Sequence, residues 1–219
     1  FTTNIPMKKT PADPVAFAKA KVEYVNCRAT SPRKLDIHGA FSVCAKVIER
    51  MPQELVGEIQ GEDIQQRKTE LSASNIVGMA QEAFTVSEVL EIGSGKPPAE
   101  SIIRSDCAIT LDDKKVLDNK LILQGQVTVK VLYATGMGED LPEHMEYTIP
   151  YSQMVDCMGV SEECICDVRV DALAADVQIR SDAAGENMMF EAEVRAMAMV
   201  TAYKNEHVTV VTDAYSTRQ

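Results

Sequence analysis

The pair Cys164 and Cys166 has the spacing in this chain that most suggests chemistry. Residues two apart on a β-strand face the same side, so both thiols can point the same way. Such a pair is half of a zinc site or a redox pair, but a zinc site needs three or four ligands. No second cysteine pair accompanies the first, and the histidines, His38, His144 and His207, are scattered. We therefore interpret both cysteines as small buried residues of a β-face, with crosslinking in an assembled shell as the alternative, and we expect no metal and no cofactor.

Other patterns that could support chemistry are incomplete. No GxSxG turn presents a serine nucleophile to a histidine. Residues 93–96, Gly-Ser-Gly-Lys, have the composition of a phosphate loop but not its full spacing, and two prolines follow where a helix N-terminus would bind phosphate. The acidic pairs at 112–113, 139–140 and 162–163 lie in predicted turns and lack the ordered oxygen ligands of a calcium loop. We predict no catalytic residue and expect the chain not to be an enzyme.

Composition and charge narrow the function classes. The 219 residues are 45% hydrophobic and 25% charged, which is typical of a globular protein, and the net charge is -11. Nucleic-acid binding needs a basic surface, so this charge argues against it, and no apolar run is long enough for a membrane helix. Six cysteines in this length favour reduced thiols in an intracellular protein. The chain begins without methionine or a signal peptide, so we expect it to be part of a longer protein.

A seven-position alternation of apolar residues occurs three times and predicts the elements that would position any site. Side chains alternate faces along a strand, so each copy should bury one face and expose the other, which places His38 in solvent. Mid-strand Gly39 and Gly125 are interpreted as sites of sheet curvature. The copies are Leu35, Ile37, Gly39, Phe41, Val43, Ala45, Val47; Leu121, Leu123, Gly125, Val127, Val129, Val131, Tyr133; and Met188, Phe190, Ala192, Val194, Ala196, Ala198, Val200.

Each copy follows another extended stretch across a turn, which predicts three hairpins. The turns are placed at 30–33, at Asp112-Asp113 and at 181–187. A short helix is predicted over 13–21 and a helical turn from Ile102. Regular short strands with turn signals favour an all-β fold of tandem antiparallel β-sandwich-like modules, or partly open barrels, with few short helices.

Four segments are predicted along the chain. Residues 1–20 form an N-terminal Pro/Lys arm, 21–92 a first β-module, 93–99 a Gly/Pro linker, and 100–219 a second β-module that contains the second and third repeat strands.

Partner contacts are predicted at strand edges and outward strand faces, where another protein can add a strand or pack. The predicted strand that contains Pro150 and Tyr151 is broken at Pro150. Proline within a strand indicates an edge or a bulge, where a partner can make contact. Met197 and Met199 lie opposite the apolar face of the third repeat strand. That strand is either covered on both faces, as in the centre of a sandwich, or presents an adaptable methionine surface to a partner.

Several stretches resemble the SPOCS domain, which occurs in spore-coat-associated proteins of clostridia and their relatives. The resemblance lies in strand patterns, without a catalytic motif, and covers most of the chain. It is carried by Lys120–Tyr133, by Tyr147–Val155, by the lead-in Gly95-Lys96-Pro97, by the closing Val211–Ser216, and by Asn26-Cys27-Arg28 with Lys34–Gly39.

The resemblance implies a non-enzymatic scaffold or adaptor in spore coat assembly, located in the mother-cell cytoplasm at the forespore surface. It implies protein partners, among them an ATP-hydrolysing morphogenetic scaffold of the coat, together with self-association. In the related morphogenetic protein a carboxy-terminal LysM module makes the scaffold contact, and this sequence contains no LysM module. No nucleic acid and no membrane insertion are expected.

Two alternatives remain open. A carbohydrate- or peptidoglycan-binding β-module would need exposed aromatic rings, and the chain has no tryptophan. A glycan pulldown lost on Tyr151→Ala would support that alternative. Hydrolase turnover lost on Cys164→Ser or His144→Ala would instead support an enzyme.

Overall fold

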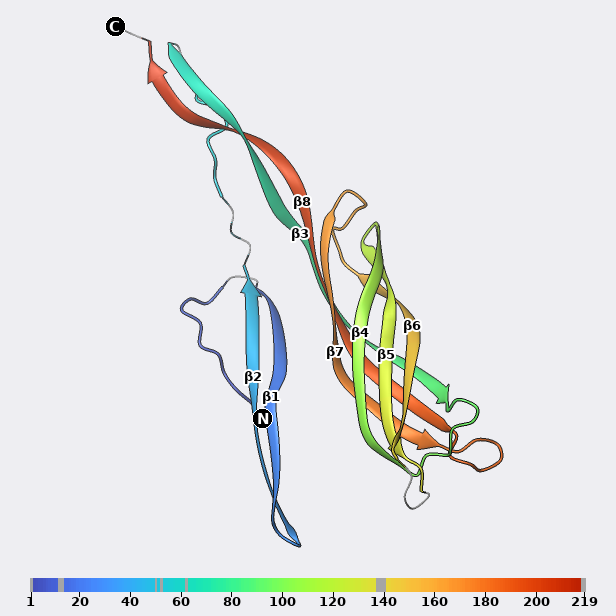
Figure 1. Ribbon diagram of the computed structural model, residues 1–219. Coiled ribbons are helices and arrows are strands. Elements are labelled where there is room, and N and C mark those ends of the chain that lie inside the picture. Colours follow the sequence, from blue (N-terminus) through green and yellow to red (C-terminus); the bar gives the residue numbers. More distant parts are fainter. Residues whose placement is uncertain are drawn as a thin grey trace. The chain divides into compact units, whose positions relative to one another are not determined.

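The computed structural model describes residues 2–11, 14–49, 51, 53–61, 63–136 and 141–217. Throughout these residues the chain is all-β and contains no helix, so the predicted fold class is confirmed. Three antiparallel sheets form, and none closes on itself (Figure 1). Their strands are β1 (Val15–Ser31), β2 (Lys34–Ile48), β3 (Ile64–Glu91), β4 (Ser101–Leu117), β5 (Lys120–Ala134), β6 (Glu143–Asp156), β7 (Ile165–Arg180) and β8 (Met189–Ser216).

The two predicted helical segments are strands instead. Residues 15–21 of the predicted helix belong to β1, and Asp13 lies outside the described residues. Ile102 lies in β4. In β1, Ala16, Ala18 and Ala20 alternate with larger or charged side chains, and this two-residue period matches the pairing of β1 with β2. Pairing with a neighbouring strand thus overrides the helical propensity of alanine.

The chain divides into two compact units, Phe1–Ile59 and Gln60–Gln219. This division differs from the predicted one, which separates the modules at 93–99. Residues 93–99 connect β3 to β4 inside the second unit, because β3 pairs along β8 far away in the sequence. The first unit contains the β1–β2 hairpin, whose two-residue connection lies within the predicted turn at 30–33.

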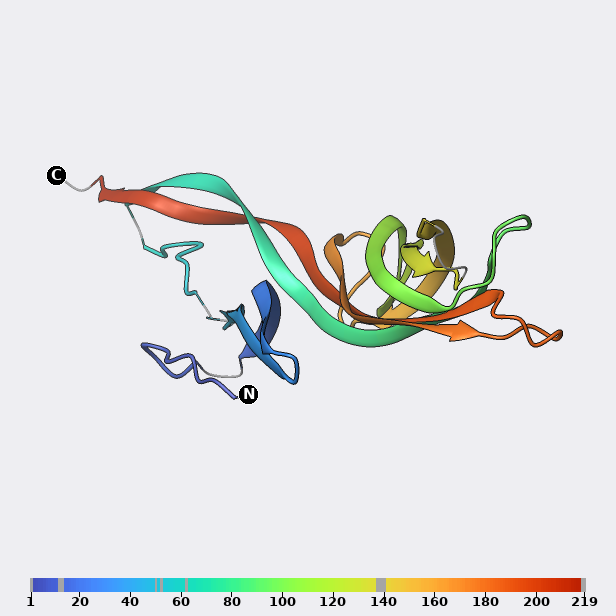
Figure 2. The same cartoon turned by 60° about the horizontal axis from the view of Figure 1, so that its bottom comes forward.

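The second unit is a sandwich of two three-stranded sheets, ordered β3-β8-β7 and β4-β5-β6. Figure 2 shows the curved β4–β6 sheet lying over the other sheet. The central strands β5 and β8 carry the second and third repeat copies, and their alternating residues from Leu121 to Tyr133 and from Phe190 to Val200 are buried between the sheets. The repeat therefore correctly predicted the core of this unit.

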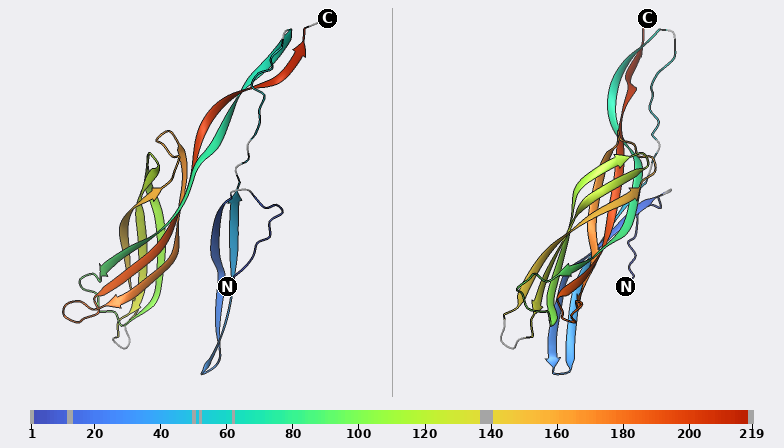
Figure 3. Two further views of the ribbon diagram at one scale, coloured as in Figure 1. Left: turned by 180° about the vertical axis from the view of Figure 1, so that it is seen from behind. Right: turned by 90° about the vertical axis from the view of Figure 1, so that its right-hand side faces the viewer.

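Strands β3 and β8 continue beyond the sandwich. They pair from Glu91/Met189 to Ile64/Ser216, whereas β7 pairs with β8 only between Met189 and Tyr203. Past Tyr203, β3 alone among the described strands pairs with β8, and the two form a twisted ribbon (Figure 3). We call residues 64–75 and 204–216 the distal ribbon.

Gly125 lies where β4 bulges, as its interpretation as a site of curvature requires. The register between β4 and β5 shifts between Leu111 and Asp113, opposite Gly125 and Gln124. A Cβ on Gly125 would overlap the Thr110 carbonyl oxygen and approach the Tyr151 hydroxyl oxygen to 2.7 Å. Glycine is required at this position because the Thr110 backbone and the Tyr151 ring leave no space for a side chain.

The predicted turn at Asp112-Asp113 is wrong, because these residues lie at the bulge inside β4. The chain reverses instead at Asp118 and Asn119, between β4 and β5. Asn119 adopts a φ of 59°, a left-handed conformation that asparagine tolerates better than most residues. The third predicted turn, at 181–187, does connect β7 to β8.

Candidate interaction surfaces

One face of the β1–β2 hairpin has no polar side chain, and we call it the hairpin apolar face. The strand register places fourteen residues on it: Ala16, Ala18, Ala20, Val22, Val25, Cys27 and Ala29 from β1, and Leu35, Ile37, Gly39, Phe41, Val43, Ala45 and Val47 from β2. Val22, Val25, Leu35 and Ile37 are 63–65% exposed. The first repeat copy thus forms the expected strand, but the face that it was predicted to bury is exposed.

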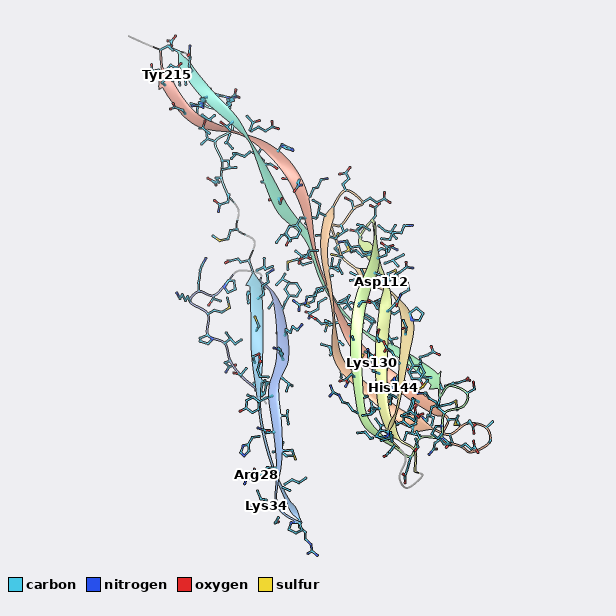
Figure 4. All side chains as sticks on the ribbon, in the orientation of Figure 1. Arg28, Lys34, Asp112, Lys130, His144 and Tyr215 are labelled. Carbon is cyan, nitrogen blue, oxygen red and sulfur yellow. The ribbon has the colours of Figure 1, made fainter. Side chains whose placement is uncertain are left out.

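The opposite face of the same hairpin carries the charged side chains, together with Val15, Phe17, Tyr24 and Ile48. Glu23 accepts hydrogen bonds from the Ser42 hydroxyl at 2.6 Å and from the Lys21 amine at 3.4 Å. His38 faces solvent as predicted, with its Nε2 3.0 Å from an Asp36 carboxylate oxygen. Arg28 and Lys34 lie near the tip of the hairpin (Figure 4). The charged side chains of the two strands thus lie on one face of the hairpin, and the other face carries none.

Met197 and Met199 lie half-buried on the outer face of β8. In the strand register Met197 pairs with Asp171 of β7, and Met199 pairs with Arg169. An ion pair of 2.9 Å joins Arg169 to Asp171 beside the two methionines. Strand β8 is central in its sheet, as one interpretation proposed, yet the outer face remains partly open to solvent.

Pro150 and Tyr151 are neighbours in β6, but they face opposite sides. β6 is an edge strand that pairs with β5 without interruption from Glu143 to Asp156, so proline does not break it. Pro150 is exposed, whereas Tyr151 is buried against Phe84 with ring centroids 5.4 Å apart. The Tyr151 hydroxyl donates to the Thr110 carbonyl at 2.8 Å. Tyr151 thus belongs to the core and offers no exposed ring to a glycan.

A shallow hollow lies beside Pro150, and a second one on the same sheet is lined by residues that include Arg104, Lys130 and His144. Asp112, Asp113, Gln124, Gln126 and Ser152 line the first hollow together with Pro150. Figure 4 labels Asp112 of β4, Lys130 of β5 and His144 of β6, which lie on the same sheet. The Arg104–Asp106 pair at 2.8 Å and the Lys130–Glu146 pair at 3.1 Å occupy the outer face there. These are exposed ion pairs, which contribute little to stability and favour a solvated face.

Cys164 and Cys166 are buried together with Cys157 in one hydrophobic cluster. All six cysteines are described, and none is paired in a disulfide. Burial, followed by the influence of the neighbouring thiols, raises the pKa of Cys157, and burial also raises the pKa of Cys166. The thiolate is therefore disfavoured at both positions. Both cysteines are buried as interpreted, but only Cys166 lies on a strand, because β7 begins at Ile165 and Cys164 precedes it.

Residues 93–96 hold the loop after β3 against β6. The Lys96 amine donates to a Glu143 carboxylate oxygen at 2.9 Å and to the His144 carbonyl at 2.5 Å. The hydrogen bond from Lys96 and its charge lower the pKa of Glu143. The acidic pair 139–140 lies outside the described residues. Among those described, no three His, Cys, Asp or Glu residues are grouped to hold a metal ion.

Sequence reasoning predicted the strand at 22–29 but missed the start of the hairpin apolar face at Ala16, Ala18 and Ala20, where it placed a helix. The signal was present, because Ala16, Ala18, Ala20 and Val22 alternate with Lys19, Lys21 and Glu23. Alanine and lysine favour helices, and this propensity obscured the alternation.

Part of the sequence matches a known protein family. Residues 98–180 match the family model described as SipL, SPOCS domain, which covers strands β4 to β7. The resemblance to the SPOCS-domain family is therefore confirmed over residues 98–180, which include Lys120–Tyr133 and Tyr147–Val155 but not the stretches at 26–39, 95–97 and 211–216. The family suggests a role associated with sporulation. No curated protein and no solved structure matched the chain. In the described part of the chain, no helix has the length and apolar character needed to span a membrane.

Proposed function

We propose that this chain is a non-enzymatic structural protein of the developing spore envelope that holds other components through protein–protein contacts. The observation that carries this proposal is the hairpin apolar face, because a wholly apolar sheet face exposed to water is costly unless another surface covers it. The SPOCS domain supplies the link to sporulation.

The partly open methionines on β8 support the same conclusion. Methionine side chains adapt to different partners, and the Arg169–Asp171 pair beside them offers polar contacts at the rim of such a surface. We propose protein partners that include the morphogenetic scaffold ATPase of the coat, and a location on the mother-cell side of the forespore surface.

Localisation and crosslinking in sporulating cells test the proposal. A tagged full-length protein should collect around the forespore and crosslink to envelope proteins. Ile37→Lys places a charge on the hairpin apolar face and should reduce the crosslinks, whereas His38→Lys adds the same charge on the opposite face and should not. A uniform distribution without specific crosslinks would refute the proposal, and so would a turnover activity that explains the sporulation phenotype.

A further inference from the structure

We propose that the hairpin apolar face is the interface of a two-fold symmetric dimer, in which the β1–β2 hairpins of two copies of this chain stack face to face. This inference deepens the proposed function, on which it rests for its biological setting, by naming a second copy as the partner.

The first reason is that the first unit covers this face only in part. Thr3 and Ile5 line a shallow hollow with Phe41 and Val43, whereas Val22, Val25, Leu35 and Ile37 stay largely exposed. The hairpin is a two-stranded sheet, and an isolated pair of strands is marginally stable in water. The β4–β5 hairpin carries the same seven-position pattern, and there the apolar face is buried against a second sheet. The pattern therefore favours packing of this face against a second sheet.

The second reason is that the face complements itself in shape. Across the hairpin, small residues of β1 lie opposite large residues of β2, as in Ala29/Leu35, Ala20/Val43 and Ala16/Val47. At one level the order reverses, with Val25 opposite Gly39. A two-fold axis parallel to the strands would place β1 of one copy over β2 of the other at the same level. Leucine would then cover alanine, and valine would cover glycine.

Most levels of the stack follow this rule of small against large, which fills the space between two layers without voids or clashes. Cys27 would lie against Ile37. Two levels depart from the rule, because Val22 and Phe41 are both larger and Ala18 and Ala45 are both small. The fourteen residues include no charged or hydrogen-bonding side chain apart from the thiol, so the interface would bury no unpaired charge.

The size of the face sets the expected affinity. Strands of 15 and 17 residues with a rise of about 3.3 Å and a spacing of about 4.8 Å cover roughly 500 Å² per copy. The total of about 1,000 Å² is at the lower limit for a specific interface. The dimer should therefore dissociate on dilution.

Sedimentation velocity of the full chain over a wide range of concentrations tests the proposal. The wild-type protein should pass from monomer to dimer as its concentration rises. Ile37→Lys should raise the dimer dissociation constant about 100-fold or more, because it buries two unpaired charges. His38→Lys carries the same charge change on the opposite face and should leave the constant unchanged. A protein that stays monomeric, or a dimer that Ile37→Lys does not weaken, would overturn the proposal.

A size exchange at one level tests the stacking geometry. Ala29→Leu places leucine against leucine and should raise the dissociation constant about tenfold. Leu35→Ala should also weaken the dimer by leaving a void. The double variant restores small against large with the sides exchanged, and its dissociation constant should return toward the wild-type value. Additive weakening in the double variant would exclude this stack.

These measurements use purified protein, so they separate the two proposals. A dimer that responds as described, in a protein that does not collect at the forespore, would refute the proposed function alone. A forespore protein that is monomeric at every concentration would refute the dimer alone.

Discussion

Gly125 illustrates how a single residue can allow a bulged strand and a buried ring to meet in the β4–β5–β6 sheet. The Tyr151 hydroxyl occupies the space above its Cα and bonds to the Thr110 carbonyl at the β4 bulge. The β4 bulge and the position of the Tyr151 ring both depend on the absence of a side chain at Gly125.

Gly125→Ala should destabilise the second unit by about 1–3 kcal/mol or more, because the new methyl group would overlap the Thr110 oxygen and the Tyr151 ring. Gly93→Ala is the matched control, since its Cβ would meet only the Met145 methyl at 3.6 Å. Denaturant unfolding measures both free energies of unfolding. Equal effects of the two variants would contradict this account of Gly125.

Tyr147 should make the stability of the second unit depend on pH in the alkaline range. Burial, followed by the influence of Tyr133, raises the pKa of Tyr147 from 10 to about 12. Below pH 10 the hydroxyl is neutral in both the folded and the unfolded chain. Between pH 10 and 12 the unfolded chain ionises first, so this contribution to stability is progressively lost.

Tyr147→Phe tests that assignment. At neutral pH the variant should be less stable by about 1 kcal/mol, because it loses the hydrogen bond that the hydroxyl donates to the Glu91 carbonyl at 2.9 Å. From pH 10 to 12 the wild-type free energy of unfolding should fall relative to that of the variant. A difference that stays constant over this range would show that the pKa of Tyr147 is not raised.

At the scale of elements, strands and core faces could be predicted from local pattern, and strand partners could not. Alternation of apolar residues correctly identified the buried residues of β5 and β8, because every second residue of β5 and, within the sandwich, of β8 is buried and is therefore apolar. The turn at Asp112-Asp113 was misplaced, because a bulge and a turn favour the same polar residues. The pairing of Ile64 with Ser216 leaves no local signal, since it depends on residues distant in the chain.

For the candidate contact residues, too, the sequence predicted the strand but not which way each side chain faces. Sequence alone identified proline as the mark of an edge strand, and β6 is an edge. It could not show that Tyr151 turns inward, because that depends on the space left above Gly125 by a neighbouring strand. Nor could it show that the first repeat copy is exposed, because burial requires a covering sheet that the pattern does not specify.

Hydrogen exchange should divide β8 into two parts. Residues 190–202 are paired on both sides by β3 and β7, and their alternate side chains are buried. Residues 204–216 of the distal ribbon are paired only with β3. We expect the distal amides to exchange far faster than those at 190–202, because local opening there exposes little buried surface. Uniform protection along β8 would indicate that another surface covers the distal ribbon.

At the scale of the whole molecule, the two units differ in charge. Residues 1–59 contain nine lysines and arginines against six aspartates and glutamates, whereas residues 60–219 contain 13 against 27. The acidity of the chain thus belongs to the second unit. This asymmetry suits a molecule whose first unit makes apolar contacts and whose second unit keeps the assembly soluble.

The division of the chain at residues 59 and 60 leads to a comparison of two fragments. A fragment 60–219 retains all six strands of the sandwich and should unfold at nearly the temperature of the second unit in the full chain. A fragment 93–219 begins at the predicted linker and lacks β3, and with it the buried side chains of Val86, Leu90 and Ile92. Burial of three such side chains contributes on the order of 5 kcal/mol, which is comparable to the whole stability of a domain. The shorter fragment should therefore be largely unfolded or aggregated, as circular dichroism and thermal melting would show. A cooperative melt of fragment 93–219 at the temperature of the longer one would mean that β3 is dispensable and that the unit begins at the linker.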